Sequence, residues 1–232
     1  MRGAALAACL VALAASACGP GPDAPPPERI RFTTGDGIEL AGDLRGRGRT
    51  GVALAHMFPE DRSVWADFAA LLADEGYLTL NFDFRGYGDS GGSMDVSRTP
   101  EDVLAAVDAL RDVGATSVAV IGASMGGTAA LVAASRAELD AVITLSAPST
   151  FMGISAPPEV LQAVDEPKLF VAAQDDGQAA ASAQAFYEQA SGAKRVEIVT
   201  GSEHGTDLLE GGRAELVRMH VLTFLRTQVP VA

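Results

Sequence analysis

A short apolar segment near the middle of the chain, interrupted by glycines on both sides of one serine, constrains the fold most strongly. Residues 122–126 read Gly-Ala-Ser-Met-Gly and fit the pattern G-x-S-x-G. In that pattern a strand ends, the chain turns sharply and a helix begins, which leaves the serine hydroxyl exposed above a sheet. Glycines are needed because a Cβ would collide with the neighbouring strand and helix in so tight a turn. Ser124 is therefore a candidate nucleophile.

The residues on either side of this motif decide how it is interpreted. A β-branched run at 117–121 precedes it, and residues 128–136, rich in helix-forming alanine and leucine, follow it. Strand, turn and helix thus occur in the order that an exposed nucleophile requires. The alternative is a Gly-Ser turn that joins two elements and holds an inert serine.

Strand and helix patterns alternate along most of the chain. Residues 35–37, Gly-Asp-Gly, lie between two strand-like runs and predict a hairpin. The alternation that follows is typical of βαβ units and of a mostly parallel sheet covered on both faces. The predicted strands are 29–34, 38–44, 51–55, 77–82, 117–121, 141–145, 168–172 and 195–199, and the predicted helices are 63–75, 100–113, 125–136, 179–191 and 210–226.

One domain accounts for residues 29–232, which show no internal repeat and no second boundary. The link at 146–166 is interrupted by prolines and leaves room for no more than one short helix. We therefore expect little or no cap and a site open to solvent on that side.

The first residues are typical of an export signal. Arg2 is followed by the uncharged apolar segment 3–17, which is shorter than the roughly 20 residues that a membrane-spanning helix needs. Residues 15–18, Ala-Ser-Ala-Cys, resemble a bacterial lipobox, in which the cysteine is lipidated and becomes the new N-terminus. We expect residues 1–17 to be a signal peptide and Cys18 to carry the lipid. A plain signal peptide cleaved after Ala17 is the alternative.

A proline-rich tether is predicted at residues 18–28, because proline lacks the amide donor and fixes φ. Such a tether suits a domain anchored in the bacterial cell envelope. Gly19 is not the aspartate that commonly retains lipoproteins at an inner membrane, so the resemblance favours an outer membrane where the cell has one. With Cys9 and Cys18 outside it, the domain contains no cysteine for a disulfide or a thiolate metal site.

The formal net charge of −13 limits the partners. An acidic surface argues against nucleic acid and against adsorption to anionic lipid heads. Keeping the protein soluble is the simpler meaning of this charge.

A serine hydroxyl is a poor nucleophile at neutral pH and needs a general base with an orienting carboxylate. The chain has three histidines. His204 lies in a glycine-punctuated loop after the last strand, at the carboxyl edge where open α/β sheets bind ligands. His56 precedes the serine, and His220 lies inside the last helix. We therefore expect His204 to be the base.

The carboxylate is expected between the serine and the histidine, after the strand at 168–172. Two adjacent aspartates stand there, and only one of them can face the imidazole. Asp176, which precedes Gly177, fits the usual spacing better than Asp175, which stays open as the alternative.

Over residues 29–228 the chain resembles the α/β-hydrolase family, whose members carry serine, acid and histidine in this order. Residues 55–59, Ala-His-Met-Phe-Pro, look like its His-Gly-x-x turn, with Met57 where glycine is usual. Residues 83–91 are similar to its Asp-x-Arg-Gly-x-Gly-x-Ser turn, which we interpret as structural, with Asp83 and Arg85 supporting loops. The resemblance implies the α/β-hydrolase fold, a mostly parallel eight-stranded sheet with helices on both faces and little or no cap.

The resemblance also implies acyl transfer through an acyl-serine. Ser124 would attack a carbonyl, His204 would carry the proton and Asp176 would orient the imidazole, while the amides of Phe58 and Met125 would form the oxyanion hole. No metal or organic cofactor is required. The expected partner is a small-molecule ester or other acyl compound, with carboxylic esters ahead of thioesters and amides.

Two other readings stay open beside ester hydrolysis. One is a peptidase or acyltransferase that uses the same residues, and the other is a non-catalytic binding lipoprotein on the same fold. The sequence indicates no oligomeric state. The candidates for an acyl pocket, each of which is also an ordinary core residue type, are Phe58, Trp65, Met125, Phe151 and Met152.

Overall fold

The computed structural model describes residues 26–231. The predicted signal peptide, the lipidated Cys18 and most of the tether therefore lie outside the described residues. Within them, every helix is too short or too polar to span a bilayer.

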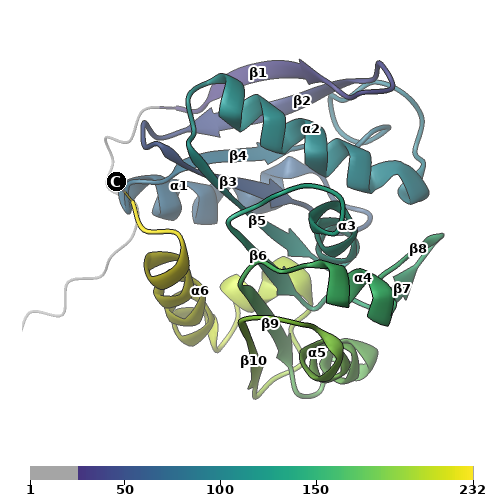
Figure 1. The fold of residues 1–232 in the computed structure, drawn as a ribbon. Helices are drawn as coiled ribbons and strands as arrows, with labels where there is room; N and C mark the ends of the chain where they lie inside the picture. Colours follow the sequence, from purple (N-terminus) through teal and green to yellow (C-terminus); the bar gives the residue numbers. More distant parts are fainter. Residues whose placement is uncertain (1–25, 232) are drawn as a thin grey trace, which may run out of the picture.

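An eight-stranded sheet runs through the described chain in the order β1-β2-β4-β3-β5-β6-β9-β10 (Figure 1). β2 pairs antiparallel with both β1 and β4, and all other neighbours are parallel. The predicted mostly parallel sheet is thus confirmed. Its strands are β1 (Glu28–Thr33), β2 (Glu39–Arg45), β3 (Thr50–Ala55), β4 (Leu78–Phe82), β5 (Ser117–Ala123), β6 (Ala141–Leu145), β9 (Lys168–Ala173) and β10 (Lys194–Val199).

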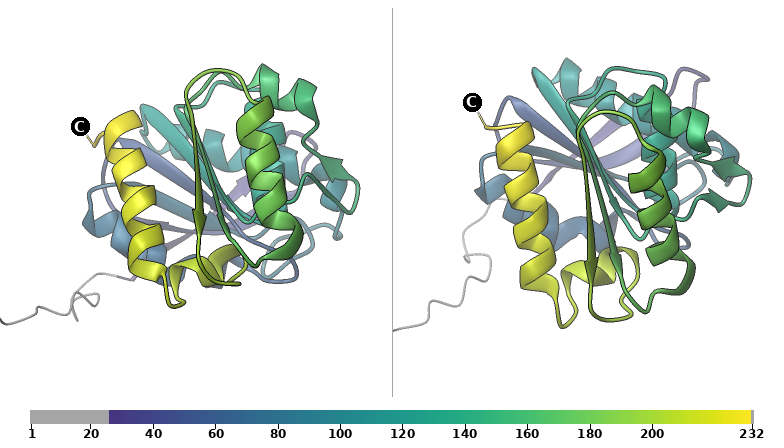
Figure 2. Two further views of the ribbon diagram at one scale, coloured as in Figure 1. Left: turned by 90° about the horizontal axis from the view of Figure 1, so that it is seen from below. Right: turned by 60° about the horizontal axis from the view of Figure 1, so that its bottom comes forward.

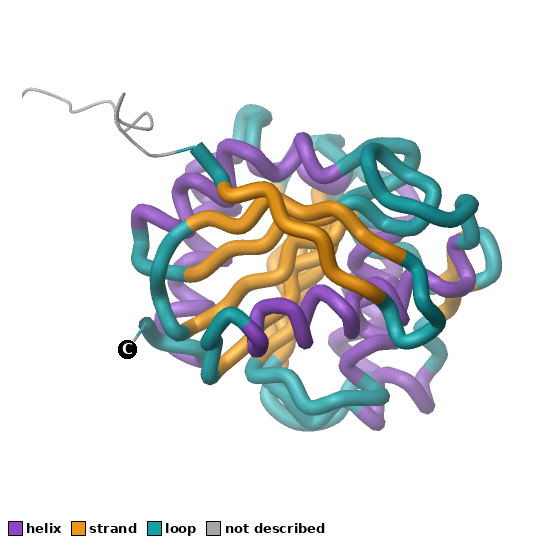
Figure 3. Tube along the Cα trace, turned by 90° about the horizontal axis from the view of Figure 1, so that it is seen from above, coloured by secondary structure: helices purple, strands orange, loops and turns teal. Residues whose placement is uncertain are grey.

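Helices cover both faces of this twisted sheet, as Figures 2 and 3 show. α1 and α6 pack on one face, and α2, α3 and α5 pack on the other. The central strands β3, β4, β6 and β9 are buried throughout, and β5 is buried except at Ser117, so all five appear in the sequence as continuous apolar runs. The helices are α1 (Ala66–Asp74), α2 (Thr99–Asp112), α3 (Met125–Ala134), α4 (Pro158–Ala163), α5 (Gly177–Gln189) and α6 (Ala214–Gln228).

Two predicted helices begin three or four residues later than expected, at Ala66 and Ala214. The helix expected at 63–75 starts with a separate 3₁₀ turn, Arg62–Trp65, and the Asp61 carboxylate caps it by accepting the amide hydrogen of Ser63 at 2.8 Å. The helix expected at 210–226 begins only at Ala214, after a 3₁₀ turn at Gly205–Leu209. Gly211 and Gly212 account for the late start, because glycine is unfavourable inside a helix.

The segment between β6 and β9 forms no cap domain. It contains a two-stranded hairpin, β7 (Thr150–Phe151) with β8 (Ile154–Ser155), and the short helix α4. The expectation of little or no cap is confirmed.

Two buried arginines join the loops after β3 and β4 to each other, to α2 and to the turn between β1 and β2. Asp83 accepts hydrogen bonds from the backbone amides of Arg62 and Asp89, both at 2.8 Å, and pairs with the Arg62 guanidinium. Arg85 donates to Asp102 from Nε at 2.9 Å and from Nη2 at 2.6 Å, and Nη1 donates to Asp36 at 2.8 Å. These contacts agree with a structural role for the turn at 83–91.

Asp102→Ala should therefore lower the free energy of unfolding by about 3 kcal/mol, because it leaves the buried guanidinium of Arg85 without one of its carboxylates. Asp108→Ala on the same helix is the control. The Asp108 side chain is 72% exposed and lies 3.6 Å from Arg111, so its loss should cost less than about 0.5 kcal/mol. Urea unfolding of both variants tests this difference, and equal losses would contradict it.

Candidate active site

Ser124 stands at the turn between β5 and α3, at the carboxyl end of β5. Its backbone has φ 46° and ψ −114°, a left-handed φ that is uncommon for a residue other than glycine. Packing explains the glycines around it. A Cβ on Gly122 would collide with the carbonyl of Gly126, and a Cβ on Gly126 would collide with the carbonyl of Ala55. The predicted strand, turn and helix are all present.

The structure brings the three predicted polar residues together. Ser124 Oγ lies 2.8 Å from His204 Nε2, and His204 Nδ1 lies 2.8 Å and 3.0 Å from the two carboxylate oxygens of Asp176. With the proton on Nδ1, the imidazole donates to Asp176 and accepts the hydroxyl hydrogen of Ser124. Ser124 is 6% exposed and the His204 side chain 43% exposed, so solvent reaches the histidine side of the pair.

Asp176, rather than Asp175, reaches the imidazole. The Asp176 side chain is only 15% exposed, whereas Asp175 is an exposed residue. The backbone amide of Asp175 donates to the carbonyl of Gly201 at 2.8 Å, which joins the acid loop to the loop of His204.

The amides of Phe58 and Met125 are available to an oxyanion. Met125 is the first residue of α3, so its amide has no acceptor within the helix. Within residues 26–231, neither amide donates to another protein group. The close approach of Gly126 to the end of β3 brings the helix start against the turn of Phe58.

His56 holds this turn and is not available as a base. Its Nδ1 donates to the carbonyl of Met57 at 2.9 Å, and its Nε2 accepts the backbone hydrogen of Phe84 at 3.1 Å. Burial lowers the pKa of His56, so the ring is neutral at physiological pH. The remaining histidine, His220, lies on α6 with Nδ1 3.4 Å from Glu197.

Met57 stands where glycine is usual, yet its backbone does not need glycine. Among the described residues, the only non-glycine residues with positive φ are Ser124, Ser146 and Met152. The departure therefore imposes no left-handed strain on the turn.

An apolar surface lies near the start of α3, which directly follows Ser124 in the chain. We call it the aromatic shelf and define it as Phe58, Tyr87, Phe151 and the adjacent Met152. The Phe58 ring centroid lies 5.7 Å from that of Phe151 and 6.5 Å from that of Tyr87, whose hydroxyl lies 3.9 Å from the Met125 sulfur. Phe58 is 39% and Met152 56% exposed. Tyr87 was missed because the turn that carries it was interpreted as structural only.

Two other acyl-pocket candidates have a different place in the structure. Trp65 is fully buried in the core on the face of α1 and α6, so it lines no pocket at this site. Met125 is also fully buried, and its sulfur contacts the hydroxyl of Tyr87 in the shelf.

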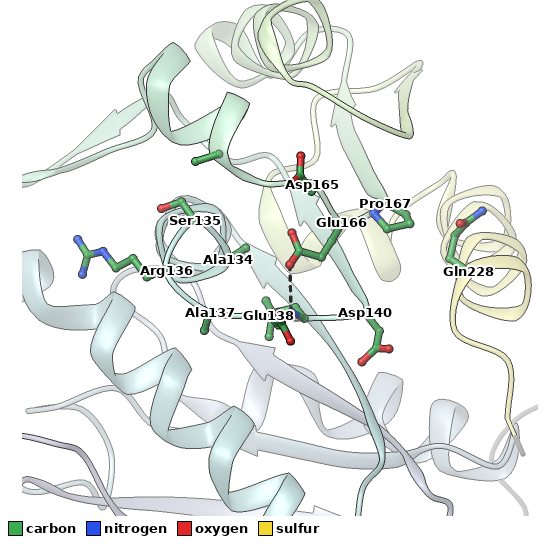
Figure 4. Close-up of a pocket in the computed structure, with 12 residues that line it drawn as sticks. Ala134, Ser135, Arg136, Ala137, Glu138, Asp140, Asp165, Glu166, Pro167 and Gln228 are labelled. Atoms are coloured by element: carbon green, nitrogen blue, oxygen red, sulfur yellow. Dashed lines mark hydrogen bonds between the residues drawn. The ribbon is translucent and has the colours of Figure 1, made fainter.

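A pocket of about 760 Å³ lies at the opposite edge of the sheet (Figure 4). It opens between the ends of α3 and α4 and the starts of β6 and β9. Two of its four carboxylates accept hydrogen bonds from backbone amides. Glu166 accepts the amide hydrogen of Leu139 at 3.1 Å, and Asp140 accepts that of Val118 at 2.7 Å. Because parallel strands point the same way, this pocket lies away from the carboxyl edge that carries Ser124.

Comparisons with known proteins agree with this architecture. Residues 52–161 match the family model described as alpha/beta hydrolase fold. No curated protein matches the sequence.

Solved structures with a similar fold include several esterases. An esterase from Pyrococcus furiosus has a TM-score of 0.77 at 22% identity, covering 87% of this chain and 91% of that one. A thermophilic esterase from Thermogutta terrifontis with malate bound has a TM-score of 0.69 at 21% identity, covering 86% and 98%. An esterase from Exiguobacterium antarcticum has a TM-score of 0.67 at 17% identity, covering 85% and 99%. At these identities the likeness shows the fold alone.

Proposed function

We propose that this chain, which has the α/β-hydrolase fold, is a serine hydrolase that cleaves carboxylic esters through an acyl-serine intermediate. The hydrogen-bonded series from Ser124 through His204 to Asp176 carries the proposal. Each residue comes from the end of a different strand, and the three follow in the order serine, acid, histidine. Esterases among the similar structures support the choice of ester over other acyl substrates.

The proposed reaction has two halves. Ser124 Oγ attacks the ester carbonyl while His204 Nε2 takes its proton, and the amides of Phe58 and Met125 hold the oxyanion. His204 then gives the proton to the leaving alcohol, and the acyl group stays on Ser124. Water, deprotonated by the same imidazole, releases the acid and restores the serine. Asp176 keeps Nδ1 protonated and stabilises the imidazolium in both halves.

Neutral esters with an apolar group are the proposed substrates. The aromatic shelf offers exposed apolar area near the start of α3, and the neighbouring segment 146–158 contains no charged residue. The other loops of the carboxyl edge present carboxylates, whereas Arg62, Arg85 and Arg98 are held in ion pairs. The negative electrostatic potential of these carboxylates should repel a substrate that carries its own carboxylate. The exposed carboxylates outside these ion pairs are Glu60, Asp95, Asp175, Asp207 and Glu210.

A pair of esters of matched length tests function and preference together. The p-nitrophenyl ester of butyric acid should be hydrolysed with a kcat/KM at least about tenfold higher than the mono-p-nitrophenyl ester of succinic acid, and added salt should narrow that gap. Phe151→Ser should lower kcat/KM about tenfold for hexanoate esters and about twofold for acetate esters, because only the longer chain reaches the shelf.

Two outcomes of this assay have different meanings, and a control variant accompanies it. Met219→Ser is the matched control, since Met219 is 52% exposed on α6, away from the shelf. Equal rates on the butyrate and succinate esters would contradict the charge argument. No hydrolysis of any ester would contradict the proposed function itself.

We also propose that Cys18 is lipidated and anchors the domain to the bacterial cell envelope. The motif at 15–18 and the proline-rich tether support this, and both precede the described domain. Cys18→Ser should move the protein from the membrane fraction to the soluble fraction when cells are fractionated in the native host. A variant that stays in the membrane fraction would contradict the anchor.

A further inference from the structure

Met57 fills the space between the turn that carries Phe58 and the loop that carries His204. Its sulfur lies 3.7 Å from the hydroxyl of Thr206. A Cβ built on Gly205 would lie 2.5 Å from the same sulfur, too close for any real contact. Gly205 and Thr206 are both buried and directly follow His204 in the chain.

The Met57 side chain projects from a fixed backbone. Its carbonyl accepts hydrogen bonds from His56 Nδ1 at 2.9 Å and from the amide of Glu60 at 3.0 Å. The side chain also packs against the core on the face of α1 and α6. The sulfur therefore presents a defined surface to the histidine loop.

On its outer side the same loop is held by Glu203. The Glu203 carboxylate accepts the amide hydrogens of Ser202 at 3.0 Å and of Gly212 at 3.2 Å, both within the loop itself. These bonds shape the loop but do not fix it against the serine. Met57 supplies a contact that spans 149 positions of sequence and joins the loop to the oxyanion turn.

We propose that Met57 is a positioning residue that sets the distance between the imidazole of His204 and the oxyanion donor at Phe58, and that Gly205 lacks a side chain in order to receive the Met57 sulfur. The proposal rests on the proposed serine hydrolase function.

A loss of this contact should act on the transition state. Both groups that Met57 aligns are used when the proton moves and the oxyanion forms, and neither binds the ground-state substrate strongly. Met57→Ala should therefore lower kcat about tenfold with KM changed less than about twofold. Met57→Leu, which preserves most of the volume, should retain activity within about threefold.

A double-mutant cycle between Met57→Ala and Gly205→Ala tests the contact directly. With Met57 present, Gly205→Ala should lower kcat/KM about a hundredfold, because the new Cβ would lie 2.5 Å from the Met57 sulfur, so that either the thioether or the loop that carries His204 must move. In the Met57→Ala protein, the same change should cost no more than about tenfold, which is the share due to the φ of +59° at Gly205. If the fold losses of kcat/KM for the two single variants simply multiply in the double variant, the proposal is overturned.

Controls separate the contact from general strain. Gly114→Ala places a side chain at φ +104° with no atom within 4 Å, and Met219→Ala removes an exposed thioether from α6. Met219→Ala combined with Gly205→Ala should give effects that multiply. If the Gly205→Ala protein does not fold, the kcat of Met57→Ala tests the proposal by itself. A Met57→Ala kcat within twofold of the wild type would then overturn it.

The cycle also has a readout that does not depend on catalysis. The free energies of unfolding of the same four proteins should show the same non-additivity, since the collision exists whether or not an ester is turned over. If the wild type hydrolyses no ester, the proposed function fails while this comparison still tests the contact. Additive unfolding energies would overturn the contact whatever the activity.

Discussion

Ser124→Ala should lower ester turnover by at least about a thousandfold, because it removes the oxygen that forms the acyl intermediate in the proposed reaction. The melting temperature should change by no more than a few degrees. Alanine keeps the Cβ at this turn, and the hydroxyl makes its one side-chain hydrogen bond with His204. Steady-state rates with a p-nitrophenyl ester, together with thermal unfolding of the same sample, measure both quantities.

His204→Ala should have an effect of similar size, since serine and base act as one unit and their losses are not additive. A double variant that lacks both groups should be no slower than either single variant. A Ser124→Ala protein that keeps more than a tenth of the wild-type rate would show that another group is the nucleophile.

Asp176→Asn should lower kcat roughly a thousandfold or more with KM little changed. An amide at this position favours the tautomer with Nε2 protonated, which cannot accept the hydrogen of Ser124, and it no longer stabilises the imidazolium. The neighbouring aspartate supplies a matched control. Asp175→Asn removes an exposed carboxylate that does not contact the imidazole, so kcat should stay within about twofold.

The two aspartate variants together assign the acid. If Asp176→Asn and Asp175→Asn lower kcat equally, the net charge beside His204 matters more than the hydrogen bond at Nδ1. A larger loss for Asp175→Asn would mean that the acid loop rearranges during the reaction.

Local patterns explain why much of this fold could be predicted. The central strands are buried on both faces, so their apolar runs are continuous and easily seen. The placement of Ser124, Asp176 and His204 follows from the same fact, because each lies in the turn or loop after one of the parallel strands. The sequence predicts the ends of the helices less accurately than their presence. The start of α6 shifted to Ala214 because two glycines and a preceding 3₁₀ turn interrupt the helical pattern.

Contacts between distant segments could not be predicted in this way. Met57 and Thr206 meet across 149 positions, and no local pattern in either segment indicates the other. The aromatic shelf likewise joins Phe58, Tyr87 and Phe151 from three separate loops. Trp65 and Met125 are apolar like the residues of the shelf, but they are buried. Tertiary packing, not residue type, determines which of these side chains is exposed.

The assignment of residues 1–28 stays a prediction from sequence. The lipobox-like motif and the prolines after it carry that prediction, and fractionation of the Cys18→Ser variant tests it separately from catalysis.

Covalent labelling by a fluorophosphonate probe tests the central claim most directly. A serine with an assembled base and oxyanion hole displaces fluoride from the phosphorus and keeps the phosphonyl group, whereas an ordinary serine does not react. We predict a single adduct on the peptide that contains Ser124, and none on the Ser124→Ala protein. A folded wild-type protein that takes up no label, or takes it up on another serine, would contradict the account.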